Sequence, residues 1–208
     1  MQRYSYPRTY HLPWSPGATS DDKRMKSTTA FVGQSVIVTE KRDGENTTLY
    51  GDGYVHARSV DGTGKEYQSW ITRKWSEVAY MIDEDIRVCG ENLFARHSIA
   101  YDSLESYFEV FGMYQGELCL AWSDVEVYAS LLDLKVVPVL YRGIWDEKAI
   151  HSLAERVVAE GGEGIVVRIE DQFDVGEFPL KVGKYVRENH VQTETHWTRN
   201  WVPNGLAR

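Results

Sequence analysis

The stretch TEKRDGENTTLY, residues 39–50, sets a cluster of charged and small residues between two more apolar segments. Residues 32–39 and 47–58 on either side have the β-branched and aromatic content that predicts strands. An Asp-Gly pair between two strands is typical of a charged hairpin turn. The same cluster also places the amine of Lys41 two residues before the aspartate and closes with Gly44. The rest of the sequence is needed to decide whether this cluster is a hairpin turn or part of a chemical site.

Length and composition predict one folded domain, with residues 1–208 forming a single domain whose first 30 residues are an irregular extension. The chain has 208 residues, of which 42% are hydrophobic and 26% charged, ordinary values for a soluble globular protein. The N-terminus lacks the apolar segment of a secretory signal, and no apolar run reaches the length of a membrane span. These features predict a cytoplasmic protein with no membrane partner.

Cys89 and Cys119 are 30 residues apart and belong to no metal-binding pattern. Both have apolar neighbours in the sequence. We therefore expect two buried, reduced thiols.

Charge is unevenly distributed along a chain whose net charge is −8, which argues against a protein that simply coats nucleic acid. Residues 1–30 and residues 178–208 each hold five basic and two acidic residues, whereas residues 143–177 hold three basic and nine acidic residues. If the two basic ends meet in the fold, they can form a phosphate-binding surface.

Hydrophobic periodicity predicts more strands than helices, without regular alternation of the two. This pattern indicates an α+β fold with antiparallel sheets. Asp146 is placed to cap the clearest helix, and Gly161 and Gly162 to end it. The expected strands are 32–39, 47–58, 86–93, 106–114, 136–143, 164–169 and 180–187, and the expected helices are 66–82, 123–134 and 145–162.

Several side chains have the chemistry of a phosphate site, although each also has a purely structural interpretation. Lys41 can act as a nucleophile once it loses its proton, and Asp43 can hold either a metal ion or the lysine. Glu91, near the end of a predicted strand, can accept hydrogen bonds from a ribose, or it can be a solvated strand-end glutamate. Phe108 and Phe111 should point to opposite faces of a strand, so that one can stack on a base; core packing of both is the alternative.

Two further candidates lie towards the C-terminus. Glu163 precedes Gly164 and an apolar strand, which suits a Mg²⁺ ligand near phosphates; an incidental acid in a loop is the alternative. Lys184 can project into a pocket from a strand that also carries Lys181 and Arg187, or all three can belong to a solvated basic strand.

The order of these candidates resembles the covalent nucleotidyltransferases, the superfamily of DNA ligases, RNA ligases and mRNA capping enzymes. Within it, the run GENLFARHSI, residues 90–99, is most similar to phage-type ATP-dependent RNA ligases. The resemblance rests on five ordered motifs, which are KRDGEN (41–46), CGENLF (89–94), YFEVFG (107–112), EGIVVR (163–168) and KYVR (184–187).

This resemblance implies a nucleotidyltransferase (ligase adenylation) domain with antiparallel sheets flanked by helices around a nucleotide cleft. It implies ATP as the AMP donor and Mg²⁺ as the metal, with Mn²⁺ as an alternative. In the catalytic roles it places Lys41 as the adenylated nucleophile, Lys184 on the α-phosphate and Arg58 on phosphate or ribose. The other implied ligands are Glu40 beside adenine, Glu91 on ribose, Phe111 stacked on adenine, Glu163 on the metal, and Lys181 and Arg187 as further cations.

Three departures from the family pattern are visible. Gly112 follows Phe111 where an acid is often found, and Arg168 stands where some relatives have lysine. Only 21 residues follow Arg187, too few for the OB-fold that DNA ligases and capping enzymes attach there. We therefore expect no C-terminal OB-fold.

The resemblance implies an ATP-dependent RNA ligase that forms lysyl-AMP, adenylates a 5′-phosphate RNA end and seals it to a 3′-hydroxyl. A phage-encoded enzyme acting in the host cytoplasm would suit it, and a partner or template could supply extra grip on RNA. The alternatives are a ligase of DNA nicks, a capping enzyme that uses GTP, and a non-catalytic nucleotide- or nucleic-acid-binding domain. GTGKE at residues 62–66 lacks the full pattern of a phosphate loop, which excludes a P-loop kinase.

Overall fold

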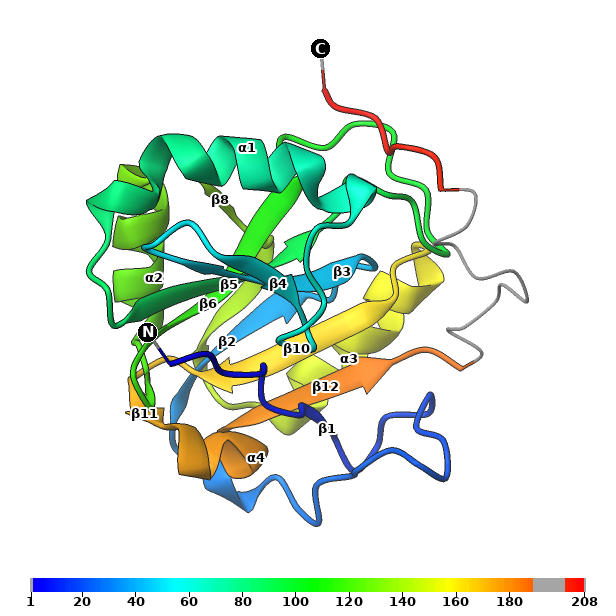
Figure 1. Ribbon diagram of the computed structural model, residues 1–208. Helices are drawn as coiled ribbons and strands as arrows, with labels where there is room; N and C mark the ends of the chain where they lie inside the picture. The colour runs from blue at the N-terminus through cyan, green and yellow to red at the C-terminus, as the bar shows by residue number, and fades with distance from the viewer. Residues whose placement is uncertain (1, 189–200, 208) are drawn as a thin grey trace. The chain divides into compact units, whose positions relative to one another are not determined.

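The computed structural model describes residues 2–188 and 201–207 of the chain. Both of its sheets are mainly antiparallel, with few helices, and this confirms the predicted α+β class (Figure 1). Among the described helices, none combines the length and the apolar character that crossing a bilayer requires. The described residues divide into two compact units, the first made of residues 2–6, 43–136 and 201–207 and the second of residues 7–42 and 137–188.

The first unit is built on a sheet in which β7, β6, β5, β3 and β4 are neighbours in that order, and β8 pairs with β6. All of these pairings are antiparallel except that between β6 and β8. The strands are β3 (Glu45–Tyr50), β4 (Val55–Ala57), β5 (Ile86–Asn92), β6 (Phe108–Gln115), β7 (Leu118–Cys119) and β8 (Lys135–Val136).

Two helices belong to this unit. Helix α1 (Ser69–Val78) has a 3-10 turn at each end, Glu66–Gln68 and Ala79–Met81, and buries Ile71 and Trp75. Helix α2 (Trp122–Leu131) buries Trp122, Val125 and Ala129. The predicted helices 66–82 and 123–134 therefore match the structure to within a few residues.

The second unit is built on a sheet with the strand order β1, β12, β10, β2, β9. The pairing of β1 with β12 is parallel and the others are antiparallel. Its elements are β1 (Tyr10–His11), a 3-10 turn (Thr29–Phe31), β2 (Ser35–Glu40), β9 (Val139–Ile144), α3 (Glu147–Ala159), β10 (Gly164–Ile169), β11 (Phe173–Asp174), a 3-10 turn (Val175–Glu177), α4 (Phe178–Lys181) and β12 (Val182–Val186).

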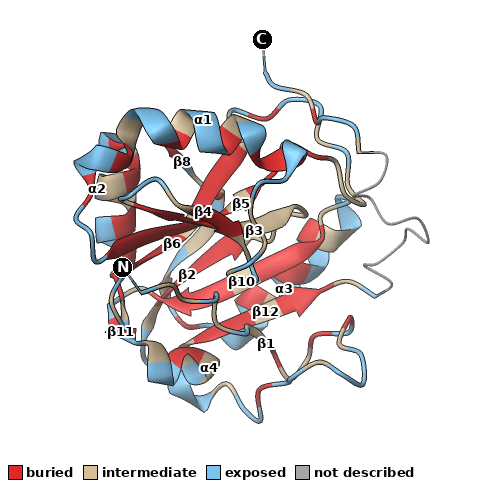
Figure 2. Cartoon of the chain, in the orientation of Figure 1, coloured by how far each residue is buried: buried red, intermediate tan, exposed pale blue. Residues whose placement is uncertain are grey.

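Helix α3 covers one face of this sheet, behind β10 and β12 in Figure 1. Asp146 caps the helix as predicted, because its Oδ1 atom accepts a hydrogen bond of 3.0 Å from the amide of Ala149. The buried stripe of α3 is Ile150, Ala154 and Val157. Buried residues are concentrated in the strands, and the outer helix surfaces are exposed (Figure 2).

The cluster at residues 41–44 is not a hairpin turn, because the strands on its two sides do not pair with each other. Strand β2 pairs with β9 and β10, whereas β3 pairs with β4 and β5. The cluster is therefore the connection between two sheets.

Three strand predictions need correction. The predicted strand 136–143 falls on two strands of different sheets, because β8 ends at Val136 and β9 begins at Val139. The predicted strand 47–58 is two strands, since the chain turns between β3 and β4 and the amide of Gly53 donates to the carbonyl of Tyr50. The predicted strand 180–187 begins only at Val182, because the residues before it form helix α4. Residues 2–28 are mainly irregular but include β1.

Cys89 and Cys119 are buried and are not joined in a disulfide bond, which confirms that prediction.

Candidate active site

Lys41 lies directly after β2, where the chain leaves the sheet of the second unit. Its amide donates to the carbonyl of Gly164 at 2.9 Å, so the pairing of β2 with β10 continues to this residue. Its Nζ atom lies 2.7 Å from the Oε2 atom of Glu163. The Lys41 side chain is 25% exposed and that of Glu163 only 7%, so a nearly buried carboxylate holds an amine that solvent can still reach.

The backbone fixes Glu163 on both sides. Its carbonyl accepts a hydrogen bond of 3.0 Å from the amide of Arg187. The next residue, Gly164, has φ of +153°, and a Cβ atom there would lie 1.9 Å from the carbonyl oxygen of Tyr185. Only glycine allows β10 to begin this close to β12, which explains the glycine after the acid.

Lys41 and Lys184 share one face of this sheet. Val166 is paired directly with Thr39 on one side and with Lys184 on the other, and directly paired residues lie on the same face. Lys41 follows Thr39 by two residues, which returns its side chain to that face. Helix α3 covers the opposite face.

The exposure pattern shows where this face is open. Val166 is the one residue of β10 that is not buried, and Lys184 is the one such residue of β12. Because these two residues are direct partners, the opening lies over β10 and β12, whereas Thr39 and His11 on either side of them in the same row are buried. A ligand on this row would contact Lys184 and lie on the same face as Lys41.

Two of the remaining predicted residues of the second unit, Glu40 and Lys181, form ion pairs. The Oε1 atom of Glu40 lies 2.8 Å from the Nη1 atom of Arg42. Lys181 ends α4 and pairs with Glu177 at 3.0 Å. The Nε atom of Arg187 is buried and has no hydrogen-bond partner in the described part of the chain. It can therefore donate a hydrogen bond to a bound anion.

In the first unit, Gly44 lies against the end of β5. Its amide donates to the Oε1 atom of Glu91 at 3.0 Å. A Cβ atom at this position would lie 2.6 Å from the carbonyl oxygen of Asn92 and 3.0 Å from the Cγ atom of Glu91. The glycine of the opening cluster is therefore needed for close approach, and it orients the carboxylate of Glu91.

Asp43 organises a loop of the first unit. Its Oδ2 atom accepts hydrogen bonds from the amide and hydroxyl of Ser98, at 2.8 and 2.7 Å, and from the amide of Ile99, at 2.7 Å. Its own amide donates to the hydroxyl of Tyr101. These contacts give the aspartate a structural role that the sequence did not reveal.

Phe111 lies at an irregularity of β6. Cys89 and Gly90 are paired with Gly112 and Val110, so Phe111 is the extra residue of a β-bulge. Phe108 is fully buried, whereas Phe111 is only half-buried. Phe108 therefore packs in the core, whereas stacking of Phe111 on a base stays a prediction. The ring of Tyr6 packs edge-on against Phe111, with centroids 5.1 Å apart and an interplanar angle of 72°.

A model of the RNA ligase family matches residues 34–186. This chain belongs to the RNA ligase family. The match covers most of the chain and confirms the family resemblance seen in the ordered motifs.

Solved structures of similar fold include RNA ligases from two sources and a DNA ligase. An archaeal ATP-dependent RNA ligase has a TM-score of 0.56 and 18% identity, over 80% of this chain and 46% of that chain. A lysine-to-alanine mutant of a Naegleria gruberi RNA ligase, solved with ATP and Mn, has a TM-score of 0.58 and 18% identity, over 83% of this chain and 55% of that chain. A putative ATP-dependent DNA ligase from Aquifex aeolicus has a TM-score of 0.57 and 20% identity, over 91% of this chain and 51% of that chain. The chain thus spans about half the length of these proteins. No curated protein sequence matches it.

In this member of the RNA ligase family, sequence reasoning missed Asn46. It is paired with Glu91 across β3 and β5, and its Oδ1 atom is buried without a hydrogen-bond partner in the described residues. A buried acceptor beside Glu91 fits a ligand that donates hydroxyl groups. The only feature of the sequence that could have indicated Asn46 is its position, as the second residue of the strand that follows the KxDG cluster. Arg58, by contrast, is exposed in a bend directly after β4.

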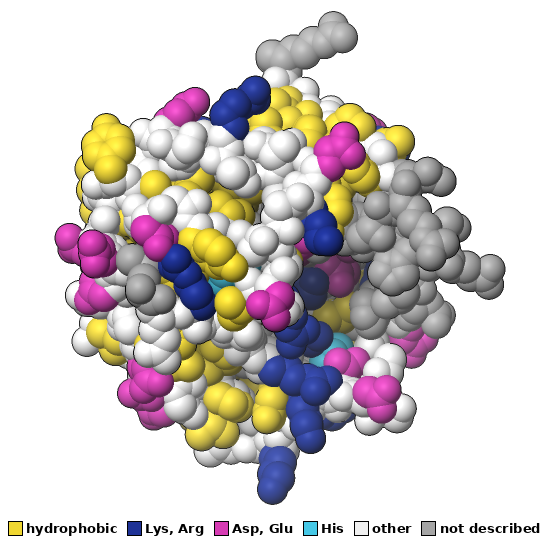
Figure 3. All heavy atoms as spheres, viewed as in Figure 1, with side chains coloured by type: hydrophobic (Ala, Val, Ile, Leu, Met, Phe, Trp, Pro, Cys, Tyr) yellow, Lys and Arg dark blue, Asp and Glu magenta, His cyan; other side chains and the backbone are white. Residues whose placement is uncertain are grey.

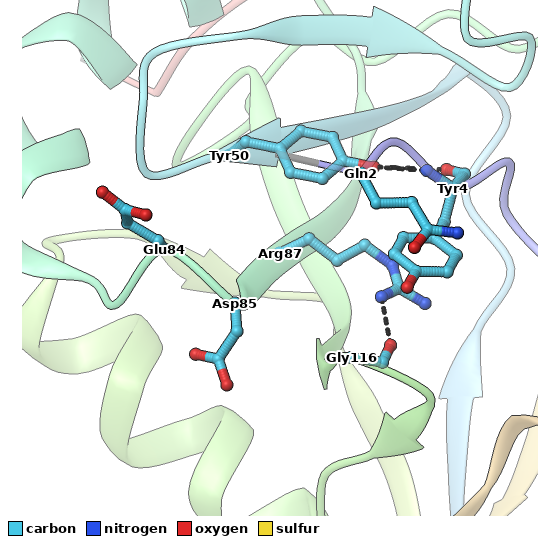
Figure 4. Close-up of a pocket in the computed structure, with 7 residues that line it drawn as sticks. All are labelled: Gln2, Tyr4, Tyr50, Glu84, Asp85, Arg87 and Gly116. Atoms are coloured by element: carbon cyan, nitrogen blue, oxygen red, sulfur yellow. Dashed lines mark hydrogen bonds between the residues drawn. The ribbon is translucent and has the colours of Figure 1, made fainter.

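The first unit also has a pocket of about 250 Å³, and none of the predicted site residues lines it (Figure 4). The guanidinium of Arg87 lies 4.4 Å from the ring centroid of Tyr4 and 4.5 Å from that of Tyr114, and it donates to the carbonyl of Gly116. Gln2 and Tyr4 line part of this pocket, so the N-terminal segment that carries Tyr6 is anchored to the sheet of the first unit.

Within residues 2–188 and 201–207, no group of three or more His, Cys, Asp or Glu side chains is arranged to hold a metal ion. Mg²⁺ at nucleotide sites is commonly bound by one or two carboxylates together with phosphates and water. The nearly buried carboxylate of Glu163, beside the open row, fits that donor set. The carboxylate of Asp43 fits it less well, because one of its oxygens already accepts three hydrogen bonds.

Proposed function

We propose that this protein is an ATP-dependent RNA ligase that works through a covalent lysyl-AMP intermediate on Lys41. The observation that supports the proposal most strongly is the Lys41–Glu163 pair, on a sheet face whose open row contains Lys184. An amine, a carboxylate and a second cation are the groups that nucleotidyl transfer to lysine requires. Membership of the RNA ligase family supports the same chemistry.

In the first step, the Nζ atom of Lys41 attacks the α-phosphorus of ATP. The ammonium first loses a proton to water, which reaches it because a quarter of the side chain is exposed. The nitrogen–phosphorus bond forms as the bond from the α-phosphorus to the bridging oxygen breaks, and pyrophosphate leaves. Holding the amine in place beside the phosphate replaces a bimolecular encounter and lowers the barrier.

Two cations of the second unit stabilise the charge that develops on the phosphoryl oxygens. Lys184 contacts the α-phosphate from the open row, and Arg187 offers its buried Nε atom. Fixed charges of this kind stabilise the transition state because they need no reorganisation during the reaction. Lys181 and Arg58 are assigned outer roles on the phosphates or ribose, since Lys181 is paired with Glu177 and Arg58 is exposed.

The first unit supplies nucleoside recognition in this proposal. Glu91 and Asn46 accept hydrogen bonds from the ribose hydroxyls, and Phe111 stacks on adenine. From the second unit, we assign Glu40, which is paired with Arg42, to the base. The family match runs through both units, which supports assigning them to one nucleotidyltransferase domain.

Glu163 is the chain's principal ligand for a divalent cation, which when bound would neutralise charge on the phosphates. We assign Mg²⁺ or Mn²⁺ to this position on the chemistry of the carboxylate. Without a cation, the same carboxylate holds Lys41 in place.

Two further transfers complete the reaction. An oxygen of the RNA 5′-phosphate attacks lysyl-AMP, the nitrogen–phosphorus bond breaks, and the Lys41 amine regains a proton. The RNA 3′-hydroxyl then attacks the activated 5′-phosphate, its proton passes to solvent, and AMP leaves as the phosphodiester forms.

The test is an RNA sealing assay with a 5′-labelled oligonucleotide, ATP and Mg²⁺. We expect the label to become resistant to phosphatase, because sealing buries the phosphate in a phosphodiester. Lys41→Ala should abolish this, and the matched variant Lys148→Ala, on the exposed side of α3, should not. Parallel arms with DNA and with GTP separate a DNA ligase and a capping enzyme from the proposal. Sealing of DNA alone, or no sealing of either, would contradict it.

A further inference from the structure

The N-terminal segment of the second unit forms a basic surface beside the proposed nucleotide row. Strand β1 pairs with β12, with Tyr10 opposite Gly183 and His11 opposite Lys184. A second segment then joins β1, since the amide of His11 donates to the carbonyl of Lys23 and the amide of Met25 donates to the carbonyl of His11. We call the exposed cations of residues 8–26 the basic edge; they are Arg8, Lys23, Arg24 and Lys26.

The basic edge continues the row that contains Lys184. His11 is paired with Lys184 on one side and bridged to Arg24 on the other. Neighbouring strands are about 4.8 Å apart, so the backbones of Lys184 and Arg24 are separated by about 10 Å. The N-terminal basic segment therefore lies beside Lys184, a cation of the second basic stretch, and Figure 3 shows Lys and Arg side chains gathered over β12, β1 and the segment after β1.

Packing holds this segment firmly on β12. The Oγ atom of Ser15 accepts from the amide of Val186 at 3.0 Å and lies 2.8 Å from the Nδ1 atom of buried His11. A Cβ atom on Gly183 would lie 2.8 Å from side-chain atoms of both Leu12 and Met25. The cations of the edge are thus carried by a fixed support.

This surface keeps a net positive charge, because its four exposed cations outnumber the two acids of the same segment, Asp21 and Asp22. Asp22 lies 3.8 Å from Arg8 and 3.6 Å from the Nε2 atom of His11. Arg24 donates to the backbone carbonyls of Pro13 and Ser15, which leaves its net charge intact. Lys23 and Lys26 make no ion pair or side-chain hydrogen bond within the residues that the structure describes.

A phosphate chain is the ligand that fits this surface. The protein as a whole carries a net charge of −8, so a polyanion is repelled elsewhere and attracted here. We propose that the basic edge binds backbone phosphates of the RNA strand whose 5′ end is adenylated in the Lys184 row. This inference rests on the proposed function. Two sources of phosphate are chemically possible, the RNA strand and the β- and γ-phosphates of ATP, and the experiment must separate them.

The test compares Lys23→Gln/Lys26→Gln with the control Lys148→Gln/Arg156→Gln. The control makes the same change of charge on exposed residues of α3, which covers the opposite face of the sheet. Binding of a 5′-phosphorylated single-stranded RNA is measured by fluorescence anisotropy over a range of salt concentrations. Adenylation of the protein is measured separately with α-labelled ATP.

We expect the edge variant to bind RNA about fivefold to tenfold more weakly, with a log–log salt slope smaller by about 1.4, the value for two lost phosphate contacts on a single strand. Its KM for ATP in adenylation should equal that of wild type. Equal RNA affinity and salt slope in the two variants would overturn the inference. A raised KM for ATP would overturn it in favour of triphosphate binding. If wild type takes no label but the binding difference appears, the proposed function fails while the RNA surface stands.

Discussion

The Nζ atom of Lys41 and the Oε2 atom of Glu163 are 2.7 Å apart although 122 residues separate them in the sequence. The contact joins the residue after β2 to the residue before β10. It places an amine that can become a nucleophile against a nearly buried carboxylate, on the sheet face that Lys184 shares.

Replacing Glu163 tests whether its carboxylate positions Lys41 for adenylation. Glu163→Gln keeps the shape of the side chain but removes the charge that pairs with Lys41 and that would bind a cation. We expect protein adenylation to slow by about 10- to 100-fold, as for loss of groups that support a metal site. Glu160→Gln, a change of an exposed acid at the end of α3, is the control. Equal adenylation rates in the two variants would remove Glu163 from the site.

Gly44→Ala tests why a glycine closes the opening cluster. The new Cβ atom would meet the carbonyl oxygen of Asn92 at 2.6 Å, so the backbone must move and Glu91 loses the hydrogen bond that orients it. We expect adenylation to fall at least about tenfold, the scale of a misplaced site geometry. At Gly112 a Cβ atom meets nothing closer than 3.6 Å, so Gly112→Ala should retain activity. A fully active Gly44→Ala protein would show that close approach is not required.

Tyr6 should affect nucleotide binding through Phe111. Its edge contact fixes the ring that we assign to adenine, and such aromatic pairs contribute about 0.5–1.5 kcal/mol. Tyr6→Ala should therefore raise the KM for ATP in adenylation by about twofold to tenfold. Tyr6→Phe retains the ring and should behave as wild type. If both variants matched wild type, the contact would have no role in nucleotide binding.

The two cysteines should not react in the native protein. Burial raises the pKa of the Cys89 thiol to about 11, so at about pH 8 almost none of it is the reactive thiolate. Cys119 is equally buried. A coloured disulfide reagent should detect no thiol before unfolding and both thiols in denaturant. Rapid reaction of the native protein would show that the core around β5 and β7 opens.

Much of the site could be predicted because its motifs are local. KxDG, the glutamate of CGENLF and the Glu-Gly pair each lie where a strand begins or ends, and periodicity located those strands. Local patterns could not show which strands pair. An Asp-Gly pair looks the same in a hairpin and in a connection between two sheets, so the turn at residues 41–44 stayed an open alternative.

Features that depend on distant segments were not predictable. Strand β1 has only two residues, too few for alternation, and its partner β12 lies more than 170 residues later in the chain. Asn204, near the C-terminus, packs in the first unit, where its side chain forms hydrogen bonds with the backbone of Leu93 and Tyr101. The bulge at Phe111 depends on how β5 and β6 pair. None of these leaves a periodic signal in its own sequence.

The most direct test of the account is whether AMP becomes covalently attached to Lys41. The purified protein is mixed with α-labelled ATP and a divalent cation, denatured, separated on a gel, and digested to locate the label by mass spectrometry. We predict label on the peptide that contains Lys41, and none on Lys41→Ala protein. Label that is absent from wild type, or that persists when Lys41 is replaced, would contradict the account.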